Sequence, residues 1–289
     1  MTNLLKRYLA PTLLTLLLTG CANLGAIRDF GALSADSASY TALTEDYLGS
    51  PERSKRYTLR KDDAQRTRLT EQAREREQLR VPLQLYHQAV SDYMAALATL
   101  AADEVTNYDG QINPLVDAAS SNGLIPAQQA DLVKAIGTLL TDAATNAYRQ
   151  RELKQLITRA NAPLQGILAD TVRLMAAFDS AIADEKALYH AYYDELMHLA
   201  GQREPVAAEL LWSQHGAIVQ GFARRQQALA PYIDTLKTIA AAHQSLYDNR
   251  DKIADQEVLD QLKQYTRKIR STYQLARTAE AGNIEGTTQ

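Results

Sequence analysis

The chain has 289 residues, of which 22% are charged, and its formal net charge is −3 at pH 7. This length suits one large domain or two ordinary ones, and the mildly acidic balance argues against nucleic acid as a partner. The chain contains one cysteine, which excludes an internal disulfide and a metal site built from several thiolates.

The first 21 residues combine three features in a set order. Lys6 and Arg7 precede an apolar run over residues 9–18, and small residues then lead to Cys21. The run is about half the roughly 20 residues that cross a bilayer, and it contains Pro11, so we do not expect a transmembrane helix. The tetrapeptide Leu18-Thr19-Gly20-Cys21 resembles the lipobox that closes the signal peptide of bacterial lipoproteins.

This resemblance implies a membrane anchor. Residues 1–20 would be a cleaved signal peptide, and Cys21 would become the first residue and carry a diacylglycerol and an amide-linked acyl chain such as palmitate. Two or three acyl chains are enough for lasting attachment. Ala22 and Asn23 follow the cysteine without an aspartate, as in Gram-negative lipoproteins that are sent to the outer membrane. We therefore expect an outer-membrane lipoprotein that faces the periplasm.

The rest of the chain is predicted to be helical. Alanine and leucine dominate its apolar residues, and most glycines and prolines stand where helices would begin or end. This pattern predicts an all-α fold, an elongated antiparallel bundle of long helices with coiled-coil-like seams. We expect four parts: the signal peptide (1–20), the lipidated N-terminus and first helix (21–50), the long-helix bundle (51–280) and a disordered tail (281–289).

Apolar periodicity places the helices at 24–48, 62–107, 126–157, 164–199, 205–247 and 255–278. Gly49-Ser50-Pro51 is expected to end the first helix, Pro82 to kink the second and Pro231 to bend the fifth. Asn161-Ala162-Pro163 fits two interpretations, a cap followed by a new helix or a kink within one very long helix.

Some of the expected seams include polar residues. The stripe over 164–199 contains Glu185 and ends at Leu199, and the stripe over 205–247 contains His215, Arg225 and His243. A histidine on such a stripe is more often a hydrogen-bonded core residue than a metal ligand. If both histidines are buried, the bundle should be sensitive to acid, because charging a desolvated imidazole is costly.

Candidate metal ligands are few. Glu195 and His198 form a Glu-x-x-His pattern, which di-iron bundles use in two copies, but no second copy exists in this chain. Spacings of four residues also allow a mononuclear site at His190, Asp194 and His198. We expect neither a metal nor another cofactor, and the polar face of a helix end is the simpler interpretation of these residues.

Motifs for nucleophilic catalysis and for phosphate-binding loops are absent from the sequence. Gly216 and Gly221 lie in a helical pattern with no strand before it, so they do not form a nucleotide loop. We expect these glycines to permit close helix contact. The sequence thus favours a protein that is not an enzyme.

Residues 51–80 are unusually basic, with ten Lys or Arg against six Asp or Glu. One interpretation is a solvated helix face with charge pairs one turn apart. The other is a strip that contacts a membrane or partner, and its candidate residues are Arg53, Lys55, Arg56, Arg60 and Lys61. In that case their replacement should leave stability nearly unchanged.

Together these features favour a non-enzymatic, lipid-anchored periplasmic scaffold or binding protein with a protein partner in the cell envelope. Two alternatives remain. One is a membrane-active helical protein of the α-pore-forming type, with residues 115–140 as its candidate hairpin, although Asp117, Asp131 and Lys134 interrupt that segment. The other is a metal-binding helical-bundle enzyme.

Overall fold

The computed structural model describes residues 24–59, 62–102, 127–144, 149–201 and 203–281. Within these ranges nearly every residue is helical and no β-strand occurs, so the predicted all-α fold is confirmed. The elements are α1 (Gly25–Ala38), α2 (Ala42–Ser54), the 3-10 turn η2 (Lys55–Tyr57), α3 (Asp63–Gln78), α4 (Arg80–Ala102), α6 (Ala127–Ala144), α7 (Arg149–Ala200), α8 (Pro205–Asp248) and α9 (Gln256–Ala281).

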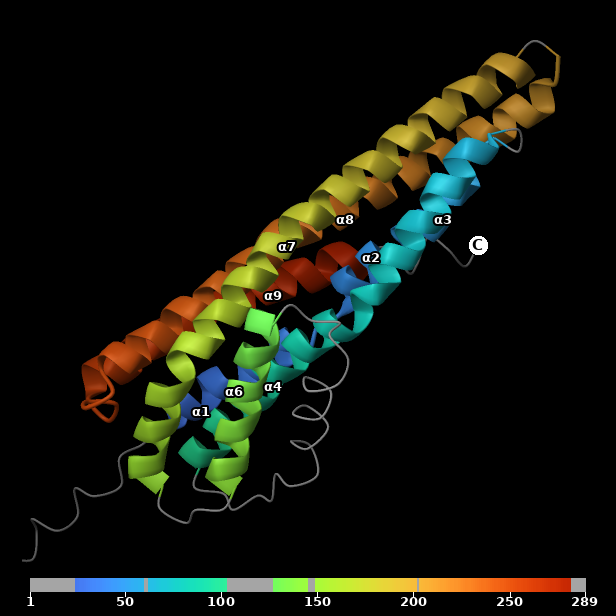
Figure 1. The fold of residues 1–289 in the computed structure, drawn as a ribbon. Helices are drawn as coiled ribbons and strands as arrows, with labels where there is room; N and C mark the ends of the chain where they lie inside the picture. Colours follow the sequence, from blue (N-terminus) through green and yellow to red (C-terminus); the bar gives the residue numbers. More distant parts are fainter. Residues whose placement is uncertain (1–23, 60–61, 103–126, 145–148, 202, 282–289) are drawn as a thin grey trace, which may run out of the picture.

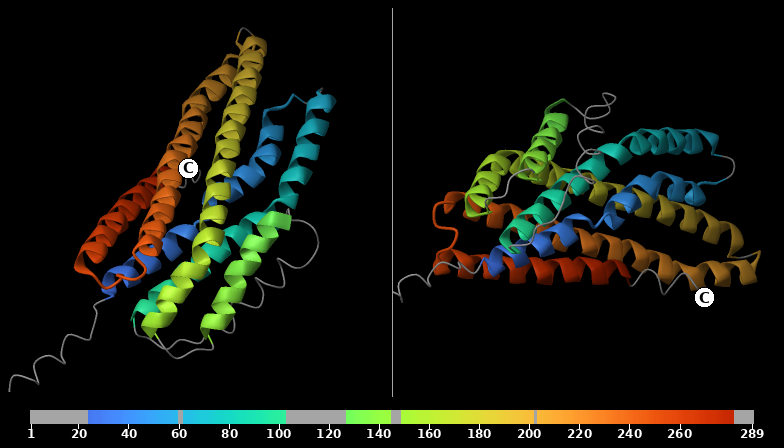
Figure 2. Two further views of the ribbon diagram at one scale, coloured as in Figure 1. Left: turned by 60° about the vertical axis from the view of Figure 1, so that its left-hand side comes forward. Right: turned by 90° about the horizontal axis from the view of Figure 1, so that it is seen from below.

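The helices form an elongated bundle (Figures 1 and 2). Its longest part is the antiparallel hairpin of α7 and α8, whose 52 and 44 residues correspond to about 78 and 66 Å. α9 packs along α8, α1 packs against α4 and α9, and α2 and α6 pack against α7. The turn between α7 and α8 projects beyond the other helices, whereas α1 and α9 both begin at the opposite end (Figures 1 and 2).

The predicted seams form the core of the bundle. Tyr93 and Leu97 of α4 are fully buried, as are Tyr232 and Ile239 of α8. Gly31 lets α1 approach α4 closely, because a Cβ atom there would lie 2.7 Å from the carbonyl oxygen of Met94. The seam of α7 fails at its end, where Leu199 is 55% exposed because the hairpin turn extends past the neighbouring helices.

The predicted first helix, 24–48, is wrong because the structure breaks it into α1 and α2. Around the break, backbone carbonyls accept hydrogen bonds from side chains of three other helices. Ser91 donates to the carbonyl of residue 35 and His87 to that of residue 38, while Tyr273 and Tyr232 donate to those of residues 36 and 40. These long-range hydrogen bonds stabilise a break that the local sequence does not signal.

The predicted stop at Gly49-Ser50-Pro51 is also wrong, since α2 continues through Pro51 to Ser54. Proline has no N–H group, so the carbonyl four residues earlier, that of Tyr47, loses its helical donor. Arg76 of α3 donates to this carbonyl at 2.9 Å, and the Ser50 hydroxyl donates to it at 3.0 Å. A side chain from another helix thus replaces the missing hydrogen bond and lets the helix run on.

Pro82, Pro163 and Pro205 differ in how they affect the helices around them. The expected 62–107 helix breaks at Leu79, three residues before Pro82, which then stands in the first turn of α4, where an N–H has no helical partner anyway. Pro163 lies inside α7, which runs unbroken through residues 161–163, so one very long helix is the correct interpretation there. Gly201 and Pro205 separate α7 from α8 as expected.

The outer limits of the predicted bundle are partly described. α9 extends to Ala281, one residue into the predicted tail, and the other tail residues lie outside the described ranges. The signal peptide and Cys21 lie outside them too. Among the described helices, none combines the length and apolar character that crossing a bilayer requires.

Candidate functional site

A buried cluster of two carboxylates and two guanidinium groups joins α2, α7 and α8. Glu185, whose side chain is 1% exposed, accepts from Arg225 at 2.8 Å and from Arg53 at 3.1 and 3.2 Å. Asp46 pairs with Arg53 at 2.9 Å and with Arg225 at 3.3 Å. Burial alone would lower the pKa of Arg225, but the two carboxylates outweigh it and raise the pKa. The cluster is neutral as a whole.

This cluster bears on the predicted basic contact strip. Arg53 faces inward onto Glu185, so its role is structural and its replacement should cost stability. Lys55 pairs with Glu52 at 2.6 Å, and Arg56 is exposed. Arg60 and Lys61 lie outside the described residues. The structure thus separates Arg53 from Lys55 and Arg56, and the expectation that its replacement leaves stability unchanged no longer holds for Arg53.

His243 is fully buried in a second polar cluster. Its Nε2 atom lies 2.5 Å from the Tyr93 hydroxyl, and its Nδ1 atom lies 2.9 Å from the amide oxygen of Asn161. The Asn161 amide nitrogen in turn donates to Gln244. Nδ1 must carry the proton, because the Asn161 oxygen only accepts, and Nε2 then accepts from Tyr93. Burial lowers the pKa of His243 to about 3, so this histidine is a neutral core residue, as its place on the stripe suggested.

His87 and His215 also have partners within the fold. His87 donates from Nδ1 to the carbonyl of Ala38, its Nε2 lies 2.9 Å from the Thr44 hydroxyl, and burial lowers its pKa. His215 is half-buried, stacks on Tyr193 with ring centroids 4.0 Å apart, and lies 3.1 Å from the Tyr189 hydroxyl. These contacts join α4 to the break between α1 and α2, and α8 to α7.

The metal candidates do not converge in the described part of the chain. Glu195 is half-buried and His198 is exposed near the end of α7, while His190 contacts the ring of His215. Across residues 24–281, with the gaps given above, no three His, Cys, Asp or Glu side chains gather closely enough to bind a metal ion. Gly216, expected to permit close helix contact, instead faces open space.

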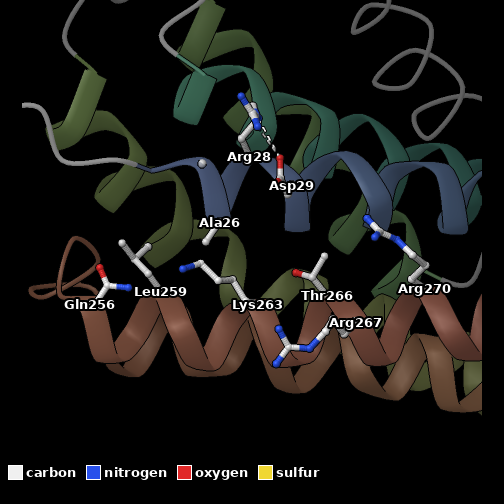
Figure 3. A pocket seen from close by; sticks show the side chains of 10 residues that line it. Ala26, Arg28, Asp29, Gln256, Leu259, Lys263, Thr266, Arg267 and Arg270 are labelled. Atoms are coloured by element: carbon white, nitrogen blue, oxygen red, sulfur yellow. Dashed lines mark hydrogen bonds and ion pairs between the residues drawn. The ribbon is translucent and has the colours of Figure 1, made fainter.

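A basic cavity between α1 and α9 was missed by the sequence analysis (Figure 3). It has a volume of about 390 Å³, and its charged lining residues are Arg28, Asp29, Lys263, Arg267 and Arg270. Lys263, Arg267 and Arg270 follow one another by four and three residues, the spacing of one helical face. That cationic stripe on the helix predicted over 255–278 was the available signal, but nothing local showed that α1 would lie beside it.

Four of the exposed large apolar side chains of the described residues lie at or beside the turn between α7 and α8. Their exposed fractions are 55% for Leu199, 83% for Val206, 59% for Leu210 and 65% for Trp212. A shallow hollow on α8 is lined by Pro205, Val206, Glu209, Leu210 and Ser213. We call residues 199–213, without residue 202, the hairpin tip. Large apolar residues gathered on a surface are typical of an interaction site.

The predicted pore-forming hairpin is only partly described. Residues 115–126 lie outside the described ranges, and from residue 127 the chain forms α6. α6 packs against α7, with Val133, Ile136 and Leu139 buried in the core. The described half of this segment is therefore an integral part of the bundle.

Comparisons of the chain with protein-family models, with curated proteins and with solved structures found no match. Function is therefore inferred from the chemistry and geometry of the chain itself.

Proposed function

We propose that the protein is a lipid-anchored scaffold or binding protein of the cell envelope, held in the outer membrane through Cys21, facing the periplasm and without enzymatic activity. One observation carries the proposal: the start of α1 and the hairpin tip lie at opposite ends of the elongated bundle (Figures 1 and 2). Cys21 precedes Gly25 by four residues, so their Cα atoms are at most about 14 Å apart. A lipid on Cys21 holds that end at the membrane, and the roughly 66 Å of α8 carries the tip away from it.

The partner of the hairpin tip is proposed to be a protein that contributes an amphipathic helix. Val206, Leu210 and Ser213 follow one another by four and three residues, so a second helix can pack along them. Arg203, Glu204 and Glu209 surround this stripe with exposed charge, and an apolar centre with a polar rim is typical of protein interfaces. The distance from the anchor argues against contact with the anchoring membrane itself.

The buried polar groups are engaged in contacts between helices, which supports a role other than catalysis. The cluster around Glu185 is closed by ion pairs, and the cluster around His243 is closed by hydrogen bonds. Each joins helices that are distant in sequence. A catalytic acid or base needs access to a substrate, whereas the side chains of Glu185 and His243 are buried and paired with other residues of the chain.

Photo-crosslinking in living cells tests the partner. A photoreactive amino acid is introduced at Val206 or Trp212 in the tip, and at exposed Gln227 farther along α8 as the matched control. We expect one defined envelope protein to crosslink at both tip positions and not at Gln227, and Leu210→Gln should abolish this crosslink. Equal labelling at all three positions, or labelling of phospholipid alone, would contradict a protein interface.

The anchor is tested separately through Cys21→Ser, which removes the sulfur atom that accepts the lipid. The variant should incorporate no labelled palmitate and stay in the inner membrane as an uncleaved precursor, while the unaltered protein is labelled and reaches the outer membrane. Normal outer-membrane fractionation of Cys21→Ser would refute the lipoprotein assignment.

A further inference from the structure

The cavity between α1 and α9 carries a net positive charge. Four cationic side chains and one acidic side chain line it. In Figure 3, Lys263 and Thr266 extend from α9 toward α1, and Ala26 faces them from α1. Its volume of about 390 Å³ lies within the range of small-molecule sites. An anionic group is therefore the ligand chemistry that this cavity favours.

Two of the four cations form salt bridges with described residues, and two do not. Arg28 pairs with Asp29 at 2.8 Å, and Lys263 pairs with Asp260 at 2.8 Å, but all four of these side chains are about half exposed and such pairs are weak. Within the described ranges, Arg267 and Arg270 make no salt bridge, and both are exposed. Their guanidinium groups are thus available to an anion in two-pronged geometry.

The N-terminal end of α1 adds to this positive potential, whereas Glu257 in the first turn of α9 offsets the dipole of that helix. Gly25 and Ala26 in the first turn of α1, and Gln256 at the start of α9, line the cavity. The N-terminal end of a helix carries a partial positive charge, and α1 has no acidic residue in its first turn to offset it. Side-chain charge and the dipole of α1 therefore favour the same kind of ligand.

The cavity lies close in sequence to the proposed lipid anchor, and this proximity indicates where its ligand comes from. Gly25 lines the cavity and lies four residues after Cys21, the residue on which the proposed lipid anchor depends. We propose that the cavity binds the phosphodiester group of an anionic phospholipid in the membrane that holds Cys21. This inference rests on the proposed function, and it relocates the membrane-contacting cations from residues 53–61 to α1 and α9.

A second contact next to the anchor would orient the bundle. A lipid on a short tether leaves the body free to tilt, whereas simultaneous binding of a headgroup at Arg267 and Arg270 restricts the tilt. Because the tether keeps the cavity close to the membrane, a weak headgroup contact is enough to be occupied. The hairpin tip would then be held at a defined height above the membrane.

Photo-crosslinking to lipid tests the inference with the full-length lipidated protein. A photoreactive amino acid replaces Ser271, which is exposed one turn after Arg267, and the protein is reconstituted in vesicles of equal parts phosphatidylglycerol and phosphatidylcholine. We expect phosphatidylglycerol to exceed phosphatidylcholine about 30-fold among the crosslinked lipids at low salt, the factor that two cations near an anionic surface supply. The excess should shrink as salt rises.

The deciding variant is Arg267→Gln with Arg270→Gln, which should remove the preference for phosphatidylglycerol without changing the helical circular dichroism. The matched control, Arg68→Gln with Arg74→Gln, removes two exposed cations from α3, away from this end of the bundle, and should keep the preference (Figure 1). Equal crosslinking of both lipids to the unaltered protein, or a preference that survives Arg267→Gln with Arg270→Gln, overturns the inference.

Flotation of the protein with vesicles separates this inference from the proposed anchor. Flotation with pure phosphatidylcholine vesicles reports the acyl chains on Cys21, whatever the cavity does. Flotation only with vesicles containing phosphatidylglycerol, lost in Arg267→Gln with Arg270→Gln, would support the cavity and refute the anchor. A protein that floats with neither kind of vesicle refutes both.

Discussion

The Nη1 atom of Arg225 lies 2.8 Å from the Oε2 atom of Glu185, and this ion pair joins α8 to α7 inside the bundle. Both residues stand on the stripes that otherwise carry apolar side chains. Arg53 and Asp46 of α2 complete the cluster, so one carboxylate in the core links three helices. The consequence is a polar contact that fixes how α2 sits on the α7–α8 hairpin.

Removal of Glu185 should strongly destabilise the protein. Glu185→Ala leaves Arg225 buried without its nearest counter-ion, and breaking a buried pair in this way costs about 3 kcal/mol or more. Asp260→Ala is the control, because Asp260 pairs with Lys263 at the same 2.8 Å but at an exposed site, where solvent screens the pair and its loss should cost little stability. Urea unfolding measures both. Equal losses would mean that the Glu185 cluster does not stabilise the fold.

Stability should fall with acid because of His243. The unfolded chain binds a proton at this residue below about pH 6.5, whereas burial lowers the pKa of the folded state to about 3. Stability is therefore complete above pH 6.5 and declines as the pH falls toward 3. Between pH 7 and pH 5, protonation of His243 in the unfolded chain lowers the free energy of unfolding by about 2 kcal/mol. Burial also lowers the pKa of His87, so this residue adds to the loss.

The variant His243→Gln checks this assignment. Glutamine keeps a hydrogen-bonding side chain but cannot titrate. Between pH 7 and pH 5, the free energy of unfolding of the variant should therefore fall by about 2 kcal/mol less than that of the unaltered protein. Urea unfolding at both pH values provides the measurement. An unchanged pH dependence would assign the acid sensitivity to other groups.

Two glycines should respond oppositely to the same substitution. Gly31→Ala places a Cβ atom 2.7 Å from the carbonyl oxygen of Met94, so α1 and α4 must separate at a cost of about 1–3 kcal/mol. Gly216→Ala meets no atom within 4 Å and should stabilise α8 by about 0.5–1 kcal/mol through helix propensity. Thermal unfolding of the two variants tests the sign. A loss at both positions would contradict the open surroundings of Gly216.

Arg76 and Pro51 should be energetically coupled. Arg76→Met removes the donor to the Tyr47 carbonyl, which should cost about 1.5–3 kcal/mol while Pro51 is present. Pro51→Ala restores a backbone N–H that can donate to the same carbonyl, so Arg76→Met should then cost about 1 kcal/mol less. A double-mutant cycle by urea unfolding measures this difference. Simple additivity would show that the two residues do not share this role.

Much of the fold was predictable because its causes are local. Apolar periodicity locates the helices and the buried seams, and it placed Glu185, Arg225 and His243 on those seams. Helix ends marked by Gly201 and Pro205 were also readable, since these residues act on their own backbone. The candidate sites were less predictable, because a cationic stripe or an exposed apolar residue acquires meaning only through its neighbours.

Residue order alone determined that this protein is helical, which faces of its helices are apolar, and that Cys21 stands in a lipobox-like context. The tertiary structure decided where the chain could break or continue against its local signals. α1 ends at Ala38 because side chains from α4, α8 and α9 donate hydrogen bonds to the carbonyls around the break, and α2 passes Pro51 because Arg76 supplies a hydrogen bond. It also placed α1 beside the cationic face of α9 and left Leu199 exposed on the hairpin tip. The physical reason is the same throughout: periodicity acts within a helix, whereas hydrogen-bond partners, counter-ions and burial come from residues far away in the sequence.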